Sequence, residues 1–182
     1  MQWFITDKGD PDALALVDGV SINGEPHYSR QTPGARMFTR NGQNIVLITP
    51  DARAVWVSFR PTPGKAKRPD GLDCWECALF RNEGPVLSST LIVEAELATA
   101  AVWGAAPKDG FITFVKPSAI RSTNPGYCYK MAGWKVVGAA RDGKPMLRAP
   151  VRTEQVSIFT WNFKPGRGGK LRREVEALGE MW

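Results

Sequence analysis

Short apolar stretches separated by turn residues predict that this 182-residue chain alternates strands and helices, beginning with several strands. Residues 54–59 and 75–80 are rich in β-branched and aromatic side chains, which is typical of buried strands. The pair Asn41-Gly42 favours a tight turn, so the apolar runs on either side of it predict a hairpin. Strands are predicted at residues 2–6, 37–40, 44–48, 54–59, 75–80, 111–115, 136–137 and 146–147.

Helical spacing is clearest in residues 87–103. The positions that share one face of this predicted helix are Leu91, Ile92, Ala95, Ala98, Thr99 and Val102. Ser88 is a suitable N-cap residue, and Gly104 is expected to end the helix. A shorter helical turn is predicted around Tyr129, and residues 170–179 predict a terminal helix.

The composition limits the class of protein. The length allows one domain spanning residues 1–182, and 43% hydrophobic with 23% charged residues is ordinary for a soluble globular chain. No apolar run approaches the ~20 residues that cross a membrane. The N-terminus lacks the basic start and apolar core of a signal peptide. Three cysteines do not suit a disulfide framework, so a reducing, cytoplasmic compartment is expected.

Basic residues gather in two segments of the chain, whose net charge is +6. Residues 60–69 are predicted to form a mobile loop between two strands, and residues 164–182 form a basic C-terminal extension. Flexible segments rich in lysine and arginine can follow a phosphate backbone without reading base sequence. The predicted DNA-binding residues are Lys65, Lys67, Arg68, Lys170, Arg172 and Arg173. The alternative is that both segments are simply solvated.

The stretch from Asn124 to Gly138 carries the most informative local pattern. It passes from a helical turn through Ala132-Gly133-Trp134 into an apolar strand, and Tyr129 lies four residues before the glycine. This pattern resembles a segment of the N-acetyltransferase superfamily, in which the tyrosine hydroxyl points at the sulfur of the acyl-thioester donor. The resemblance implies that Tyr129 donates a proton to the leaving thiolate, a task that suits a weakly acidic phenol. The alternative is that these aromatic residues only fill the core.

The order of the predicted elements also resembles that superfamily. It implies an α/β, acetyltransferase-like fold with a central mixed, mostly antiparallel sheet flanked by helices. In that fold, the loop after the fourth strand holds the diphosphate of an acyl-CoA-like donor through backbone N–H groups. Arg81 and Gly84 match the first half of this loop, whereas Pro85-Val86 departs from the second half and lacks one N–H donor. The predicted donor-binding residues are Arg81, Gly84, Ser88 and Ser89, with helix capping as the alternative role of Ser88.

Several longer runs resemble the phage Mom-type DNA-modification proteins and their phage and prophage relatives. They are residues 77–84, 87–95, 109–115 and 124–129, together with His27-Tyr28-Ser29-Arg30 near the start. The resemblance spans about residues 27–148. It implies transfer of a carbamoylmethyl-type group to the N6 amine of adenine in double-stranded DNA, which hides sites from host restriction enzymes. It also implies the cytoplasm of a host bacterium as the setting.

His27 is the only histidine of the chain and lies in a polar segment beside Tyr28. A histidine combined with tyrosine or carboxylate oxygens suits iron better than structural zinc. The Mom-type resemblance implies iron, so His27, Tyr28 and Asp109 are the candidate ligands, and His27 is also a candidate base. Structural roles are the alternatives: a lone histidine is often a satisfied structural residue, and Asp109-Gly110 is ordinary turn chemistry.

Cys74 and Cys77 do not predict a zinc site, because no second cysteine pair exists and the motif falls in a predicted strand. Buried free thiols are expected instead. Most tryptophans, including Trp56, are expected in the core. Trp161 and the terminal Trp182 are freer, so one of them is a candidate to stack on a base.

Two other functions are compatible with these residues. A conventional N-acetyltransferase acting on a small amine or peptide would share the fold, although Pro85 in the donor loop counts against it. A DNA-binding module without catalysis would share the basic segments, but it would have no use for Tyr129 or Arg81.

Overall fold

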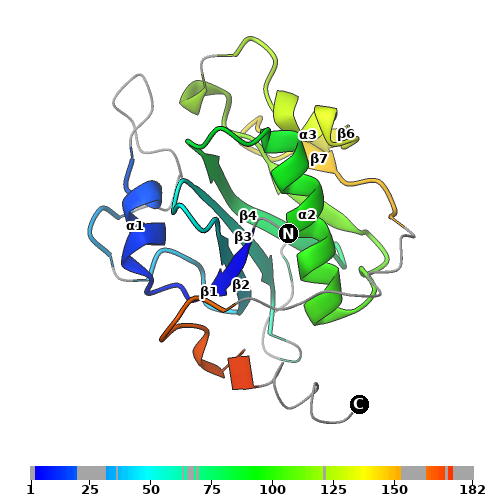
Figure 1. Ribbon diagram of the computed structural model, residues 1–182. Coiled ribbons are helices and arrows are strands. Elements are labelled where there is room, and N and C mark those ends of the chain that lie inside the picture. Colours follow the sequence, from blue (N-terminus) through cyan, green and yellow to red (C-terminus); the bar gives the residue numbers. More distant parts are fainter. Residues whose placement is uncertain are drawn as a thin grey trace.

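A seven-stranded mixed sheet with helices on both faces makes up the part of the chain that the computed structural model describes (Figure 1). The described residues are 3–19, 32–35, 37–62, 64, 68, 70–120, 122–152, 163–170 and 172–173. The strands are β1 (Phe4–Thr6), β2 (Gln43–Ile48), β3 (Ala54–Arg60), β4 (Trp75–Asn82), β5 (Phe111–Phe114), β6 (Lys135–Ala139) and β7 (Pro145–Arg148). The helices are α1 (Pro11–Val17), α2 (Ser88–Trp103) and α3 (Tyr127–Met131), with a 3-10 turn at Pro117–Ala119. The predicted α/β class is confirmed.

The strands lie in the order β1-β2-β3-β4-β5-β7-β6, and every neighbouring pair is antiparallel except β4 and β5. The parallel pairing is short and ends at Cys77↔Thr113. β4 continues to Asn82 whereas β5 ends at Phe114, so the two strands are not paired beyond that point. α2 connects them and crosses in front of the sheet in Figure 1. The candidate site lies where these two neighbouring strands stop pairing.

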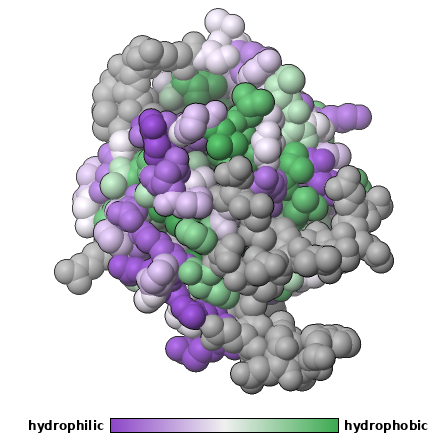
Figure 2. Space-filling view, viewed as in Figure 1, coloured by the Kyte–Doolittle hydropathy of each residue, from purple (hydrophilic) through white to green (hydrophobic). Residues whose placement is uncertain are grey.

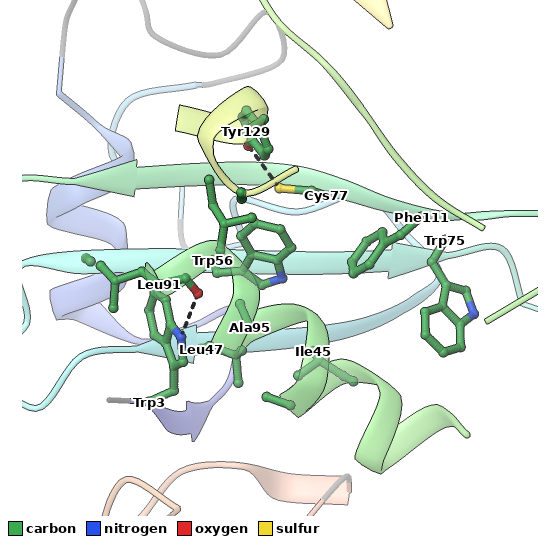
Figure 3. Packing of buried hydrophobic residues seen from close by; sticks show 14 of the residues in the cluster. Trp3, Ile45, Leu47, Trp56, Trp75, Cys77, Leu91, Ala95, Phe111 and Tyr129 are labelled. Atoms are coloured by element: carbon green, nitrogen blue, oxygen red, sulfur yellow. Dashed lines mark hydrogen bonds between the residues drawn. The ribbon is translucent and has the colours of Figure 1, made fainter. Parts of the chain in front are cut away.

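Alternation along the central strands divides the core between the two faces of the sheet. In β3, Trp56 packs in the cluster on the α2 side, and its neighbours Val55 and Val57 pack in the cluster on the α1 side. Aromatic rings fill much of the α2 side, where the Trp3 indole donates to the carbonyl oxygen of Leu91 at 3.1 Å (Figure 3). Full burial of each large apolar side chain contributes roughly 2 to 3 kcal/mol. The prediction that Trp56 belongs to the core is confirmed.

α2 buries most of the face that its spacing predicts: Leu91 and Thr99 have no exposed surface, whereas Val102 is half-buried. Gly104 ends the helix with a φ of 83°, which glycine adopts without strain. The predicted capping role of Ser88 is wrong. Ser88 is the first helical residue, and Leu87 occupies the cap position without a side-chain cap hydrogen bond.

The hairpin predicted around Asn41-Gly42 is also wrong. Residues 37–40 form no strand, and β2 pairs with β1 on one side and β3 on the other. Glycine is needed at Gly42 for a different reason, because a Cβ there would lie 2.4 Å from the Phe59 ring. α1 is absent from the sequence-based prediction, although Asp10 caps it and a proline follows. The other predicted strands are present with small shifts of their ends.

The described part of the C-terminal extension lies against β1. The Lys164 amide donates to the carbonyl oxygen of Ile5 at 2.9 Å, and Phe163 forms a parallel bridge with the same residue. The Lys164 ammonium donates to both carboxylate oxygens of Asp10 at 2.9 Å. Burial opposes ionisation of Asp10, but hydrogen bonds from Thr6 and Lys164 keep its pKa below the usual value. Lys164 therefore attaches the extension to the rest of the fold.

Candidate active site

The Tyr129 hydroxyl lies where β4 and β5 stop pairing. α3 carries the ring into the core on the α2 side of the sheet, and the hydroxyl oxygen lies 3.3 Å from the Cys77 sulfur (Figure 3). Cys77 and Thr113 are the last paired residues of the two strands, and the Thr113 hydroxyl donates to the carbonyl oxygen of Cys77 at 3.0 Å. Three hydrogen-bond donors therefore lie close together at the end of the β4–β5 pairing: the Tyr129 hydroxyl, the Cys77 thiol and the Thr113 hydroxyl.

A β-bulge in β4 lies directly after Cys77 and reverses the alternation of the residues that follow. The pairing of β3 with β4 skips Ala78, because Val57 pairs with Leu79 and the next residue of β3 pairs with Cys77. Cys77 therefore belongs to the core cluster on the α2 side, whereas Leu79 belongs to the cluster on the α1 side. In a regular strand, Cys77 and Leu79 would share one face, because they are two residues apart. The bulge thus takes Leu79 off the face on which Cys77 lies beside Tyr129.

Neighbouring rings and backbone turns hold Tyr129 in place. Its ring centroid lies 5.0 Å from that of Trp134 and 6.1 Å from that of Phe80. Gly126 begins α3 with a φ of 75°, and Gly133 follows the helix with a φ of 88°. The Trp134 amide then donates to the carbonyl oxygen of Tyr129 at 2.9 Å. The glycines of this segment provide left-handed backbone turns, and its buried aromatic residues fill the core in addition to any chemical role.

Burial keeps the hydroxyl and the thiols protonated at neutral pH. Tyr129 is 7% exposed, and burial, followed by the neighbouring Cys77 and Cys128, raises its pKa well above the usual value. Burial also raises the pKa of Cys77, and it raises that of Cys74 to about 11. Tyr129 therefore carries its proton at neutral pH, which is the state that a proton donor needs. Protonated thiols are poor zinc ligands, and all three cysteines are free, as expected from the sequence.

The predicted anion site requires Arg81 at the start of α2, but the structure places the Arg81 side chain elsewhere. Arg81 pairs across the strands with Val55 and therefore points to the α1 face, because paired residues share a face. Its Nε donates to a carboxylate oxygen of Glu83 at 2.6 Å. Its guanidinium carbon lies 2.9 Å from the position that a Cβ on Gly19 would take. The β-bulge at Ala78 explains the difference from the prediction, because it places the later residues of β4 one position out of the alternation that Trp75 and Cys77 begin.

The loop between β4 and α2 uses its own polar groups internally. The Gly84 amide donates to Asn82 Oδ1 at 2.8 Å. Asn82 Nδ2 donates to the carbonyl oxygen of Val86 at 2.7 Å and to the Ser88 hydroxyl oxygen at 3.0 Å. Pro85 has no amide hydrogen. Among the predicted donor-binding residues, Ser88 and Ser89 lie in the first turn of α2, Gly84 lies in the loop, and Arg81 lies apart from them.

These residues do not fit the diphosphate of an acyl-CoA-like donor. The Asp51 Oδ2 oxygen lies 3.8 Å from the position that a Cβ on Gly84 would take. A hydrogen bond from Thr49, opposed in part by burial, lowers the pKa of Asp51, so this carboxylate is ionised at neutral pH. A negative charge beside the loop disfavours a diphosphate, and Arg81 is not placed to offset it. A step through such a donor is therefore not part of the proposed chemistry.

Asp109 lies in the turn before β5. Its Oδ2 accepts from the Asp73 amide at 2.9 Å, and its Oδ1 lies 4.0 Å from Arg148 Nη2. This arrangement matches the interpretation of Asp109 as a turn residue. The other two candidate iron ligands, His27 and Tyr28, lie outside the described residues. Within the described ranges, no group of three His, Cys, Asp or Glu side chains could hold a metal, and the iron set stays a prediction.

Arg68 is predicted to be an exposed DNA-binding residue, but its side chain is buried. Its side chain is 8% exposed, and it pairs with Glu76 at 2.5 Å and with Asp70 at 2.6 Å. Burial lowers the pKa of Arg68, but hydrogen bonds to Asp70 and Glu76 outweigh that effect and raise it. A buried guanidinium with two carboxylate partners is not available to a phosphate. Lys65 and Lys67, from the same predicted loop, lie outside the described residues.

The remaining predicted DNA-binding residues lie near the end of the described chain. Lys170 and Arg173 are exposed, and the Arg172 guanidinium lies 5.5 Å from the centroid of the Phe163 ring. Of the predicted helix at 170–179, residues 170, 172 and 173 are described, and all three are helical. Trp161 and Trp182, the candidates for base stacking, lie outside the described residues.

A buried charged cluster joins α2 to the segment after β7, and the sequence-based reasoning missed it. Glu96 is 6% exposed, and it accepts from the Trp134 indole at 2.6 Å and from Arg152 Nε at 2.8 Å. Arg152 also donates to the carbonyl oxygen of Ala132 at 2.6 Å. Burial raises the pKa of Glu96, although its two partners oppose the rise. The available signal was an acidic residue directly after Ala95, at the edge of the apolar helix face.

No family model, curated protein or solved structure significantly matches this chain. The resemblance to Mom-type proteins therefore stays a prediction from the sequence runs that carry it. None of the described helices is both long enough and apolar enough to cross a membrane.

Proposed function

We propose that this protein is an acetyltransferase-like group-transfer enzyme that modifies the N6 amine of adenine in double-stranded DNA. The observation that carries the proposal is the protonated Tyr129 hydroxyl where two parallel strands separate. The order of elements, with α2 connecting the one parallel pair of the sheet, supports the acetyltransferase-like fold. The Mom-type sequence runs support adenine as the acceptor, a carbamoylmethyl-type group, and a bacterial cytoplasm as the setting.

Tyr129 is the proposed proton donor of the reaction. The transfer forms a bond between the adenine N6 and a donor carbon, and it breaks the bond between that carbon and its leaving atom. The N6 nitrogen loses one proton, and the leaving atom gains one from Tyr129, whose raised pKa keeps the hydroxyl protonated until a basic atom develops beside it. His27, outside the described residues, is the proposed acceptor of the proton from N6. The phenolate then recovers a proton from solvent.

Cys77 is a suitable hydrogen-bond partner for the Tyr129 hydroxyl in the resting enzyme. A thiol forms only weak hydrogen bonds, so Tyr129 gives up little when its hydroxyl turns toward a leaving atom. The donor is proposed to enter where β4 continues beyond Cys77 without β5 beside it, on the edge opposite β3. The adenine must leave the stacked duplex to reach such a buried group, as bases do in other base-modifying enzymes.

Resistance to restriction enzymes tests the proposal. Deproteinised DNA from cells that express the chain should resist endonucleases whose recognition sites contain adenine and should stay cleavable at sites without adenine. Cleavage of both classes at the rate seen with empty-vector DNA would contradict adenine modification. A conventional N-acetyltransferase or a DNA-binding module without catalysis would also leave both classes cleavable.

Replacing Lys170 and Arg173 together with alanine should weaken DNA binding without unfolding the chain. Each exposed cation that neutralises a phosphate steepens the log-log dependence of binding on salt by ~0.9, so the double variant should lose about 1.8 of slope. Fluorescence anisotropy with a duplex of arbitrary sequence at several salt concentrations measures this slope. The matched control replaces Lys108 and Arg141, which are exposed in other loops. An unchanged slope in the first variant would exclude these two residues from the DNA interface.

A further inference from the structure

A pocket of about 230 Å³ lies between the β2–β3 turn and the β4–α2 loop. Pro50 and Asp51 line it from the turn, Gly84 and Val86 line it from the loop, and Leu91 lines it from α2. Figure 2 shows an apolar area of the surface near the N-terminal end of α2, where the neighbouring Leu87 is also exposed. The pocket therefore combines apolar walls with one carboxylate.

Asp51 presents one oxygen to this pocket. Its Oδ1 accepts from the Thr49 hydroxyl at 2.6 Å and from the Arg53 amide at 3.2 Å. Its Oδ2, on the side of Gly84, receives no hydrogen bond from any other described residue. The Thr49 hydrogen bond also lowers the pKa of Asp51, despite the opposing effect of burial, which keeps the carboxylate negative at neutral pH.

Several other polar groups of the pocket wall are already engaged. The Thr49 hydroxyl donates to Asp51, and the Gly84 amide donates to Asn82. The side-chain amide of Asn82 donates to the carbonyl oxygen of Val86. Pro85 offers no amide hydrogen. The wall therefore presents one unpaired acceptor, Asp51 Oδ2, and the donors beside it already have acceptors. This arrangement favours a cationic ligand that donates hydrogen bonds over an anionic ligand.

We propose that this pocket binds a primary alkylammonium group. The ammonium donates to Asp51 Oδ2, and the alkyl stem lies against Pro50, Val86 and Leu91. A short alkyl chain with one terminal charge matches both features of the lining. The pocket is distinct from the Tyr129 hydroxyl, and its ligand can be measured whether or not the chain modifies DNA.

Titration of the full chain with n-butylammonium at low salt, followed by NMR shifts of backbone amides, tests the proposal. Residues of the β2–β3 turn and the β4–α2 loop should shift together, and n-butanol, which lacks the charge, should bind about fivefold more weakly. Asp51→Asn should weaken n-butylammonium binding about fivefold as well. The asparagine oxygen can still accept from Thr49 and Arg53, so the turn is kept. Asp142→Asn, at an exposed and distant turn, is the matched control and should change nothing.

Titration with inorganic pyrophosphate tests the opposite hypothesis, that this pocket binds an anion. The lining predicts no saturable shifts of these loops with pyrophosphate. Arg53 lies beside Gly84, since its Cβ is 3.3 Å from the position of a Cβ on that glycine. Pyrophosphate binding that Arg53→Gln weakens and Asp51→Asn strengthens would overturn the proposal, as would the absence of n-butylammonium shifts in the folded parent chain.

Discussion

Replacing Tyr129 with phenylalanine should lower the rate of adenine modification by about 100- to 10,000-fold, the usual contribution of a positioned acid or base. The substitution removes only the hydroxyl that lies 3.3 Å from the Cys77 sulfur. The ring keeps its packing against Trp134 and Phe80, so the fold should survive. The fraction of modified adenine, measured at fixed times after induction in cells, gives the rate.

Tyr127→Phe is the matched control for this variant. Tyr127 lies in the same helix two residues earlier, but its side chain is 55% exposed and points away from the core. Its loss of a hydroxyl should leave the rate unchanged. Thermal unfolding of both variants should be close to that of the parent. A Tyr129→Phe variant that modifies adenine at the parent rate would remove Tyr129 from the reaction.

Replacing Arg152 with methionine should lower the free energy of unfolding by roughly 3 kcal/mol near neutral pH, the low end for a broken buried ion pair, because Arg152 is partly exposed. The change leaves the Glu96 carboxylate, which is 6% exposed, without its cation. Burial already raises the pKa of Glu96, and loss of Arg152 raises it further. Because the folded pKa lies above the unfolded one, stability is retained below the unfolded pKa and falls as the pH rises through the folded pKa. Urea unfolding at a series of pH values measures this trend.

Glu96→Gln in the Arg152→Met background separates the buried charge from the lost contacts of arginine. Glutamine can still accept from the Trp134 indole, which lies 2.6 Å from the glutamate oxygen. The double variant should therefore recover most of the lost stability at neutral pH, and its pH dependence should flatten. Equal instability of the single and double variants at neutral pH would show that the charge of Glu96 is not the cause.

Much of the sheet could be predicted because its signals are local. β3 and β4 are apolar runs of the expected length, and the face of α2 follows from helical spacing alone. The Asn41-Gly42 pair misled the prediction, because glycine there makes room for the Phe59 ring instead of forming a hairpin turn. α1 is predictable from its local signal alone, since Asp10-Pro11 is a regular helix start.

The site was only partly predictable. Tyr129 follows from a local motif. Its partner Cys77 shares a face with Trp75 two residues earlier, but it is distant from Tyr129 in sequence, and β4 has a bulge at Ala78 directly after it. A bulge depends on how two strands pair, so the alternation of β4 by itself does not reveal it. The position of Arg81 depends on that bulge: regular alternation from Cys77 would place Arg81 on the α2 face, and the skipped Ala78 places it on the α1 face. The burial of Arg68 depends on Glu76 and Asp70, which local charge density does not reveal.

Mass spectrometry of nucleosides tests the central claim most directly. DNA from cells that express the chain is digested to nucleosides, in parallel with DNA from cells that express Tyr129→Phe. The parent sample should contain a heavier form of deoxyadenosine, with the mass of a carbamoylmethyl-type addition, and the variant sample should contain almost none. Only unmodified deoxyadenosine in the parent sample, with the chain expressed and folded, would contradict the account.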